Sequence, residues 1–474
     1  MHLFNFSRWP VFTAVSLFSQ LPFAQELTPQ TNTFASDVQL TQDQKLSAGI
    51  NDTVAKSIEI SLNFERSNWA NGSVDGDPFY RVPSNASNAP PGSLLKLQVN
   101  ANTSAYTLPP NTALSRLLFQ TETLNGSTVP ASAYVLWPYT PRDEGDGYPV
   151  IGWAHGTSGV FGNCAPSHIR NLWYQFTVPF TLALQGYVVV APDYAGLGVH
   201  QDAGGNRFRH AYLGSPAGAN DLFYSVQAAQ TAFSVLSKRF LLMGHSQGGG
   251  VAWAAAQRQA SKPVDGYLGA IAGSPVTDMY DLVQTSLNAP ALGMLIANGL
   301  PDIFPSFDAS AFLTPNGLNV YRLISEIQGC NSVALPSFAD PSLSQPEWYN
   351  DFYAQRYFDL VSNGGKVVAG PLLVIQGDAD PVVLPNLTDH AVNVTCAQYP
   401  LSQIQYLIYA GATHTPVMYA NQRAWLEWIA DRFAGKETPT SCSTSKVSSA
   451  RPYDDYQAEA NWFIEYATAP YEVA

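Results

Sequence analysis

The stretch FLLMGHSQGGGVAWAAA, residues 240–256, sets one serine among glycines, between two apolar segments. Residues 240–243 form a short apolar run that predicts a buried strand, while residues 251–259 are rich in alanine and have the spacing of a helix packed on a sheet. Between them, residues 244–248 read GHSQG and fit the G-x-S-x-G pattern, in which a sharp strand-to-helix turn strains the backbone of the serine. The alternative interpretation is a glycine-rich turn with an incidental serine. Because a strand and a helix flank the motif as it requires, we predict that Ser246 is a nucleophile.

Apolar runs that end in Gly, Asp or His recur along the chain and alternate with helical patterns, notably over residues 217–235 and 421–433. Continuous apolar strands with helical crossovers predict an α/β fold, with a mainly parallel central sheet covered by helices on both faces. In such a sheet, ligands bind at the carboxyl ends of the strands. A hairpin around Asn125-Gly126 comes before this alternation. The runs are YPVIGWAHGTSG (148–159), YVVVAPDYAGLG (187–198), RFLLMGHSQGG (239–249), YLGAIAGSP (267–275), PLLVIQGDAD (371–380) and QYLIYAGATH (405–414).

A serine hydroxyl is a poor nucleophile at neutral pH, so it needs a base and a third group that orients the base. In the α/β-hydrolase order the acid follows the serine and the histidine follows the acid. Two aspartates compete for the acid role in the segment IQGDADPVV. We favour Asp380, which lies two positions into the loop and matches the G-x-x-D pattern. Asp378 is interpreted as a turn residue that bonds its own backbone.

One of the eight histidines has the position that a base requires. His414 follows the last predicted strand and precedes the final helix, so we predict that it is the base. His245 adjoins the serine, but adjacent side chains point apart in such a turn, so it cannot easily serve. The histidines expected to be exposed or structural, in loop or helix-edge positions, are His168, His200, His210 and His390.

The tetrahedral intermediate of acyl transfer needs two backbone N–H donors. One is expected from Gln247, at the start of the helix that follows the serine, where the helix dipole also helps. The other is expected from Thr157 in the segment AHGTSG, less favourably from Gly156, and the Thr157 hydroxyl could add a hydrogen bond. The alternative for this segment is a simple glycine turn. The scattered cysteines and the absence of H-E-x-x-H or a Gly-rich phosphate loop predict neither metal nor cofactor.

The net charge of the protein and its first 24 residues indicate where it is located and which partners it can bind. The 474 residues carry a formal net charge of −13, which disfavours nucleic acid and anionic membranes as partners. Residues 1–24 combine Arg8, a short apolar run and Ala24 at a possible cleavage point, which is typical of a signal peptide. No later run is long enough for a transmembrane helix. We therefore expect a secreted, extracellular protein with no integral membrane segment after signal removal.

Cysteines and glycosylation sequons agree with secretion. The even set of Cys164, Cys330, Cys396 and Cys442 predicts up to two disulfides, with all three pairings open. Seven N-x-[ST] sequons predict glycosylation at several surface sites, at Asn51, Asn71, Asn85, Asn102, Asn125, Asn386 and Asn393.

A long insertion separates two parts of the predicted core. It contains two helix-like segments rich in large apolar residues, and its position would overhang the carboxyl ends of the strands, so we interpret it as a cap or lid. An extra structural subdomain is the alternative. The polar residues before the core are expected to form a loosely structured arm, and no function is assigned to the tail. The predicted units are a signal peptide (1–24), an N-terminal arm (25–92), the core (93–277 and 366–436), the cap or lid (278–365) and a C-terminal tail (437–474).

The ordered motifs resemble the secretory lipase family of fungi and bacteria, which includes the type-A yeast lipases. The matching stretches are VVVAPDYAGLG, HAYLGSPAGANDLFYSVQAAQ, MGHSQGGG, GDADPVV and GATH, within residues 117–433. The resemblance implies an α/β-hydrolase with a helical lid that cleaves carboxylic esters, with Ser246, Asp380 and His414 at the family's triad positions. The expected partner is a small-molecule or lipid ester, with transient contact at a lipid interface.

Two other functions stay open from the residues alone. A serine peptidase can use the same groups on the same fold, and a catalytically silent protein can keep the scaffold for binding. The substrate also has two interpretations. Apolar side chains of the insertion either line a tunnel for a medium or long acyl chain or only pack the cap against the sheet. The side chains in question are Leu287, Leu292, Met294, Leu295, Ile303, Phe304, Phe307 and Phe312.

Overall fold

The computed structural model describes residues 37–84, 86–143, 145–286 and 288–457. The expected signal peptide, residues 1–24, and the sequon at Asn85 lie outside the described residues.

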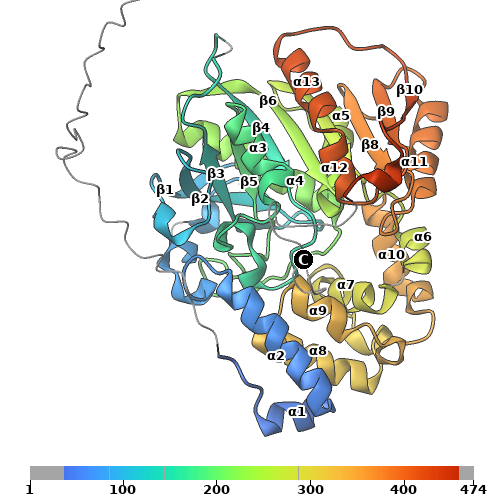
Figure 1. Cartoon of the computed structure of the whole chain (residues 1–474). Coiled ribbons are helices and arrows are strands. Elements are labelled where there is room, and N and C mark those ends of the chain that lie inside the picture. Colours follow the sequence, from blue (N-terminus) through green and yellow to red (C-terminus); the bar gives the residue numbers. More distant parts are fainter. Residues whose placement is uncertain (1–36, 85, 144, 287, 458–474) are drawn as a thin grey trace, which may run out of the picture.

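One sheet of ten strands runs through the described residues, in the order β1-β2-β3-β5-β4-β6-β7-β8-β9-β10 (Figure 1). The pairs among β1, β2, β3 and β5 are antiparallel, and all pairs from β5 to β10 are parallel. The expected hairpin is the pair β2–β3, and the mainly parallel sheet is confirmed. The strands are β1 (Leu94–Gln98), β2 (Ala113–Glu122), β3 (Thr128–Trp137), β4 (Tyr148–Ala154), β5 (Val188–Pro192), β6 (Leu236–His245), β7 (Tyr267–Gly273), β8 (Leu372–Gly377), β9 (Ile404–Tyr409) and β10 (Ser443–Val447).

Helices cover both faces of this sheet, as continuous apolar strands require. On β6, Leu242 belongs to the apolar core under α4 (Ser215–Ala232), α5 (Gln247–Ser261) and α11 (Pro385–Gln398). Its neighbour Met243 belongs to the core under α3 (Pro179–Leu184), α12 (Pro416–Ala420) and α13 (Gln422–Phe433). Successive side chains of a strand point to opposite faces, so one strand serves both cores. The α/β-hydrolase architecture follows.

The insertion at residues 278–365 is helical and lies at one end of the sheet (Figure 1). We call it the cap segment. Three of its helices supply side chains to the same cavity as Ser246, so the cap segment lies over the carboxyl end of β6. Its helices are α6 (Met279–Thr285), α7 (Ala289–Ile303), α8 (Pro315–Ile327), α9 (Asn331–Ser337) and α10 (Phe352–Val361).

The expectation of a loosely structured N-terminal arm is wrong for its described part. Two helices, α1 (Gln42–Ala48) and α2 (Asp52–Ser67), pack on α8 and α9 of the cap segment (Figure 1). Thr41 and Asn51 cap these helices through their side-chain oxygens. Ile58 and Leu62 of α2 are fully buried against the core. Polar composition hid this short apolar face, because polar and charged residues alternate with the apolar ones along α2.

Two disulfides hold outlying segments to the core. Cys164 bonds to Cys330, which joins the loop after β4 to the residue before α9. Cys396 of α11 bonds to Cys442, just before β10, so the tail is fastened beside β9. The expected number of disulfides is therefore confirmed. No helix among the described residues is long and apolar enough to cross a membrane.

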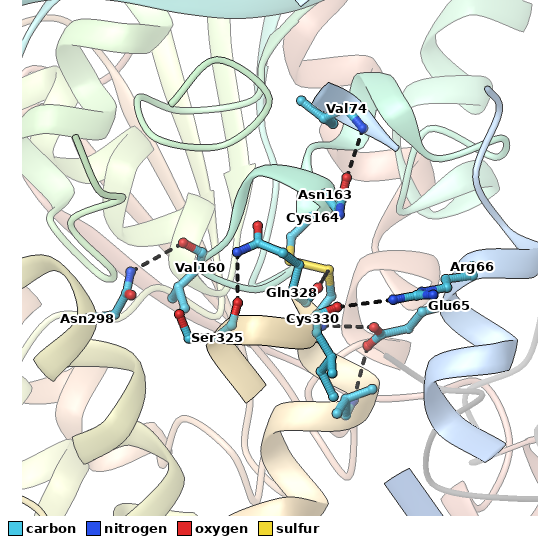
Figure 2. The surroundings of a disulfide bond; sticks show 12 residues. Glu65, Arg66, Val74, Val160, Asn163, Cys164, Asn298, Ser325, Gln328 and Cys330 are labelled. Atoms are coloured by element: carbon cyan, nitrogen blue, oxygen red, sulfur yellow. Dashed lines mark hydrogen bonds between the residues drawn. A yellow bond between two sulfur atoms is a disulfide. The ribbon is translucent and has the colours of Figure 1, made fainter. Parts of the chain in front are cut away.

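A glutamate of the N-terminal helices supports the first disulfide (Figure 2). One oxygen of the Glu65 carboxyl group accepts the backbone N–H of Cys330 at 2.8 Å, and the other accepts that of Val333 at 3.0 Å. Burial raises the pKa of this carboxyl to about 8, although these N–H groups and Arg66 favour its charged form. The Glu65 side chain of α2 therefore accepts N–H groups at the start of α9 in the cap segment.

Candidate active site

Ser246 lies at the turn between β6 and α5 with φ 59° and ψ −121°, a left-handed geometry that non-glycine residues rarely adopt. Its N–H donates to the Gly273 carbonyl at 2.9 Å, which fixes the turn against β7. A Cβ on Gly248 would lie 1.9 Å from the Ala154 carbonyl oxygen, so only glycine fits there. The strained turn expected from the GHSQG pattern is present, and the glycine spacing explains it.

His414 and Asp380 meet at the carboxyl ends of β9 and β8. The His414 Nδ1 lies 2.7 Å from the Asp380 Oδ2, and the other carboxylate oxygen accepts the N–H groups of Val382 at 2.9 Å and Val383 at 3.0 Å. The Gln376 Nε2 donates to the Asp380 Oδ2 at 3.1 Å. Burial raises the pKa of the Asp380 carboxyl, but His414 and these donors outweigh burial and hold it below its ordinary value. Asp380 is thus a buried, charged partner for His414.

Asp378 has partners other than those we expected. It accepts the Gly411 N–H at 2.6 Å and pairs with Lys446 of β10 at 2.7 Å, rather than bonding its own turn. Burial alone would raise its pKa, but Lys446 and the Gly411 N–H lower it below the ordinary value. Asp378 therefore ties the tail to the loop before Asp380.

A single cavity of about 1090 Å³ contains Ser246 and His414 in its lining. Residues 173–177 and 409–420 line two walls, the cap segment lines a third, and tail residues from Val447 to Gln457 line a fourth. Within the described residues, no Asp, Glu, Lys or Arg side chain lines this cavity. This volume is slightly above the range of about 300–1,000 Å³ that is usual for small-molecule sites. Together with the uncharged lining, it suits a large apolar ligand.

The cap side chains expected to form a tunnel mostly do not line the cavity. Of the described residues in that set, only Leu292 lines the cavity. Leu282 and Leu335, which lie outside the set, line it as well. Met294 and Phe312 are fully buried in the cap, where they pack with its other apolar side chains. Leu287 lies outside the described residues. Most of the large apolar side chains of the cap segment therefore serve to pack the cap itself.

The two expected N–H donors come from different segments, Gln247 from the start of α5 and Thr157 from the loop after β4. Gln247 is the first residue of α5, whose first-turn N–H groups have no partner within the helix. Thr157 lines the cavity, but its hydroxyl is hydrogen-bonded to the Tyr212 hydroxyl at 2.9 Å. The Thr157 hydroxyl therefore has a protein partner in Tyr212, and it can still donate to an oxyanion only where the Tyr212 hydroxyl is the donor of the pair.

His245 has contacts that the sequence did not indicate. Its ring is fully buried, with Nδ1 2.9 Å from the Tyr174 hydroxyl and Nε2 3.0 Å from the His414 carbonyl oxygen. Burial lowers the pKa of this ring to about 3. His245 faces the backbone of His414, so it does not compete for the role of base. Tyr174 carries no motif, and no sequence signal would have found it.

Four other histidines have partners outside the predicted triad or are exposed. His200 pairs with Asp75 at 3.3 Å, and His390 is exposed. His210 is buried and its ring contacts the Gln247 side chain at 3.1 Å. His168 is buried against Trp69, and burial lowers its pKa to about 3. In the part of the chain that the structure describes, no group of three His, Cys, Asp or Glu side chains could hold a metal ion.

Known proteins resemble this chain in sequence and in fold. The family model described as serine aminopeptidase, S33, matches residues 173–418. Lipase 5 of Candida albicans is 22% identical over 419 residues, covering 82% of this chain and 87% of that protein. Lipase A of Candida antarctica in its closed state has a TM-score of 0.65 at 18% identity, covering 78% of this chain and 89% of its own. The rice cell wall degrading esterase LipA of Xanthomonas oryzae has a TM-score of 0.57 at 19% identity, over 73% and 99%.

Proposed function

Since the chain belongs to the α/β-hydrolase family described as serine aminopeptidase, S33, we propose that it is a secreted carboxylic-ester hydrolase. In this proposal the core comprises residues 93–277 and 366–436, and residues 278–365 form the cap over its active site. Ser246, His414 and Asp380 are the proposed nucleophile, base and orienting acid. The likeness to yeast lipases supports esters as the substrate class.

The proposed reaction proceeds through an acyl-enzyme. The Ser246 hydroxyl attacks the ester carbonyl while the His414 Nε2 takes its proton, and Asp380 holds the Nδ1–H of the resulting imidazolium. The N–H groups of Gln247 and Thr157 stabilise the oxyanion. His414 then gives the proton to the departing alcohol. Water attacks the acyl-enzyme by the same steps and releases the acid and the free serine.

The choice of an ester rests on the lining of the cavity, which is uncharged as far as the structure describes it. An aminopeptidase must hold a cationic α-amino group, and burying such a charge without an anionic partner is costly. No carboxylate among the described residues lines the cavity beside Ser246, whereas apolar side chains dominate it. An apolar acyl chain meets no such cost and gains from burial. The description of the family model keeps peptide cleavage as the second candidate.

Exposed apolar residues at the rim of the cavity support the proposed contact with a lipid interface. Val382, Tyr419 and Tyr456 line the cavity and are also between 42% and 46% exposed, so its rim presents apolar surface to solvent. Secretion is supported by the two disulfides and by the sequons. Every sequon asparagine that the structure describes is exposed.

Replacing the nucleophile tests this function. Ser246→Ala should reduce hydrolysis of p-nitrophenyl esters by about 10⁶-fold, a loss typical for a triad nucleophile, without changing the melting temperature. Turnover within tenfold of the parent would refute the role of Ser246. Cleavage of an aminoacyl anilide by the parent protein, without cleavage of simple esters, would instead establish the peptidase.

A further inference from the structure

We propose that Tyr174 and His245 are positioning residues that hold the His414 loop, and through it the imidazole, in register for proton transfer with Ser246. The inference rests on the proposed function, because it assigns both side chains to the same reaction. Neither residue belongs to the triad or to the proposed oxyanion donors. Together they form a chain of hydrogen bonds from the cavity wall to the base.

The hydrogen atoms in this chain have only one consistent arrangement. The His414 carbonyl can only accept, so the His245 Nε2, at 3.0 Å, must carry the proton of a neutral ring. The Nδ1 of the same ring is then an acceptor, and the Tyr174 hydroxyl at 2.9 Å must donate to it. The His414 carbonyl therefore fixes the tautomer of His245, and the Tyr174 hydroxyl supplies the donor for the ring nitrogen that this tautomer leaves as an acceptor.

His245 is placed to link the nucleophile to the base. It directly precedes Ser246 and ends β6, while its ring lies 4.6 Å from the ring of His414. The ring is fully buried, so water does not replace the Tyr174 hydroxyl as its partner. Any displacement of His245 would move the loop that carries His414 relative to the turn that carries Ser246.

Tyr174 is held by a backbone that stores strain beside the cavity. Four successive non-glycine residues, 172–175, have positive φ angles between 34° and 62°, a conformation that L-residues adopt only under constraint. The Tyr174 hydroxyl lies so close to Gly156 that a Cβ there would be 1.9 Å from it. Trp173 and Gln175 of this turn line the cavity. The same turn thus shapes the substrate wall and presents the tyrosine to His245.

The test uses Tyr174→Phe, which removes the hydroxyl and keeps the ring. Without this donor, the buried Nδ1 of His245 has no partner, so the ring is held less firmly and the loop that its Nε2–H holds through the His414 carbonyl can shift. The expected result is a kcat for p-nitrophenyl ester hydrolysis lowered about tenfold, with KM unchanged, since one buried hydrogen bond is worth about that factor.

The matched control is Tyr267→Phe, because the Tyr267 hydroxyl is buried without a hydrogen-bond partner. It should leave kcat and KM unchanged. Tyr174→Phe should also have little further effect when His245 is already replaced by leucine, since the tyrosine acts through the histidine. The inference is overturned if Tyr174→Phe behaves like the control, or if it raises KM alone. A parent protein that cleaves no ester would refute the proposed function itself, which separates the two failures.

Discussion

Asp380→Asn should lower kcat by about 10⁴-fold, while Asp378→Asn should change it little. The structure gives the reason for the first effect. One oxygen of Asp380 accepts two backbone N–H groups, from Val382 and Val383, and an asparagine would keep its carbonyl oxygen there. Its amide NH₂ would then replace the Oδ2 that faces His414 at 2.7 Å. The amide donates to Nδ1, so the proton of a neutral His414 moves to Nε2, which can no longer take the proton of Ser246.

The same substitution sets two NH₂ groups against each other. The Gln376 Nε2 lies 3.1 Å from the Asp380 Oδ2 and would face another donor, so the free energy of unfolding should fall by about 1–3 kcal/mol. Single-turnover kinetics with a p-nitrophenyl ester, together with thermal unfolding, separates the two effects. Asp378→Asn is the matched control, because it removes only the partner of Lys446 and weakens the bond to the Gly411 N–H. A 10⁴-fold loss in the control, with near-parent turnover for Asp380→Asn, would refute the reasoning.

Two further predictions concern the cavity and the cap. The value of kcat/KM for p-nitrophenyl esters should rise from the acetyl ester toward medium or long chains by nearly fourfold per methylene, about 0.8 kcal/mol each, because the cavity is apolar and holds about 1090 Å³. A steady decline beyond four carbons would mean a shallow site. The pKa of Glu65 is about 8 in the folded protein against an ordinary value of 4.5, so between these values the folded state holds a proton that the unfolded chain has released. The stability of the parent protein, relative to Glu65→Gln, should therefore fall as pH rises from about 5 to 8. The melting temperatures of the two proteins are measured across this range. A difference between them that does not change with pH would contradict the burial of this carboxyl.

The parts of the site that follow from local physics could be predicted from the sequence. Only glycine tolerates the contacts at Gly248, and the change from a strand period to a helix period locates the turn around Ser246. The positions of Asp380 and His414 follow from strand ends that meet at one edge of the sheet. Their assigned roles remain predictions until activity is measured.

The rest depends on which surfaces meet in the folded chain. Apolar character alone does not tell whether a cap residue faces a cavity or its neighbours, so the sequence leaves both interpretations open for Phe312, which packs inside the cap. The buried face of α2 exists only because α9 covers it. Tyr174 reaches His245 through a left-handed turn of non-glycine residues, for which composition carries no signal. The pairing of Cys396 with Cys442 likewise requires the tail to lie beside β9.

Covalent labelling of Ser246 tests the central claim most directly. The protein is treated with a fluorophosphonate probe, and the adduct is located by intact-protein and peptide mass spectrometry. We expect a single adduct on the Ser246 hydroxyl in the parent protein, much slower labelling of Asp380→Asn and no adduct on Ser246→Ala. An unlabelled parent, an adduct on another residue, or labelling that persists in Ser246→Ala would contradict the claim that Ser246 is a nucleophile activated by His414 and Asp380.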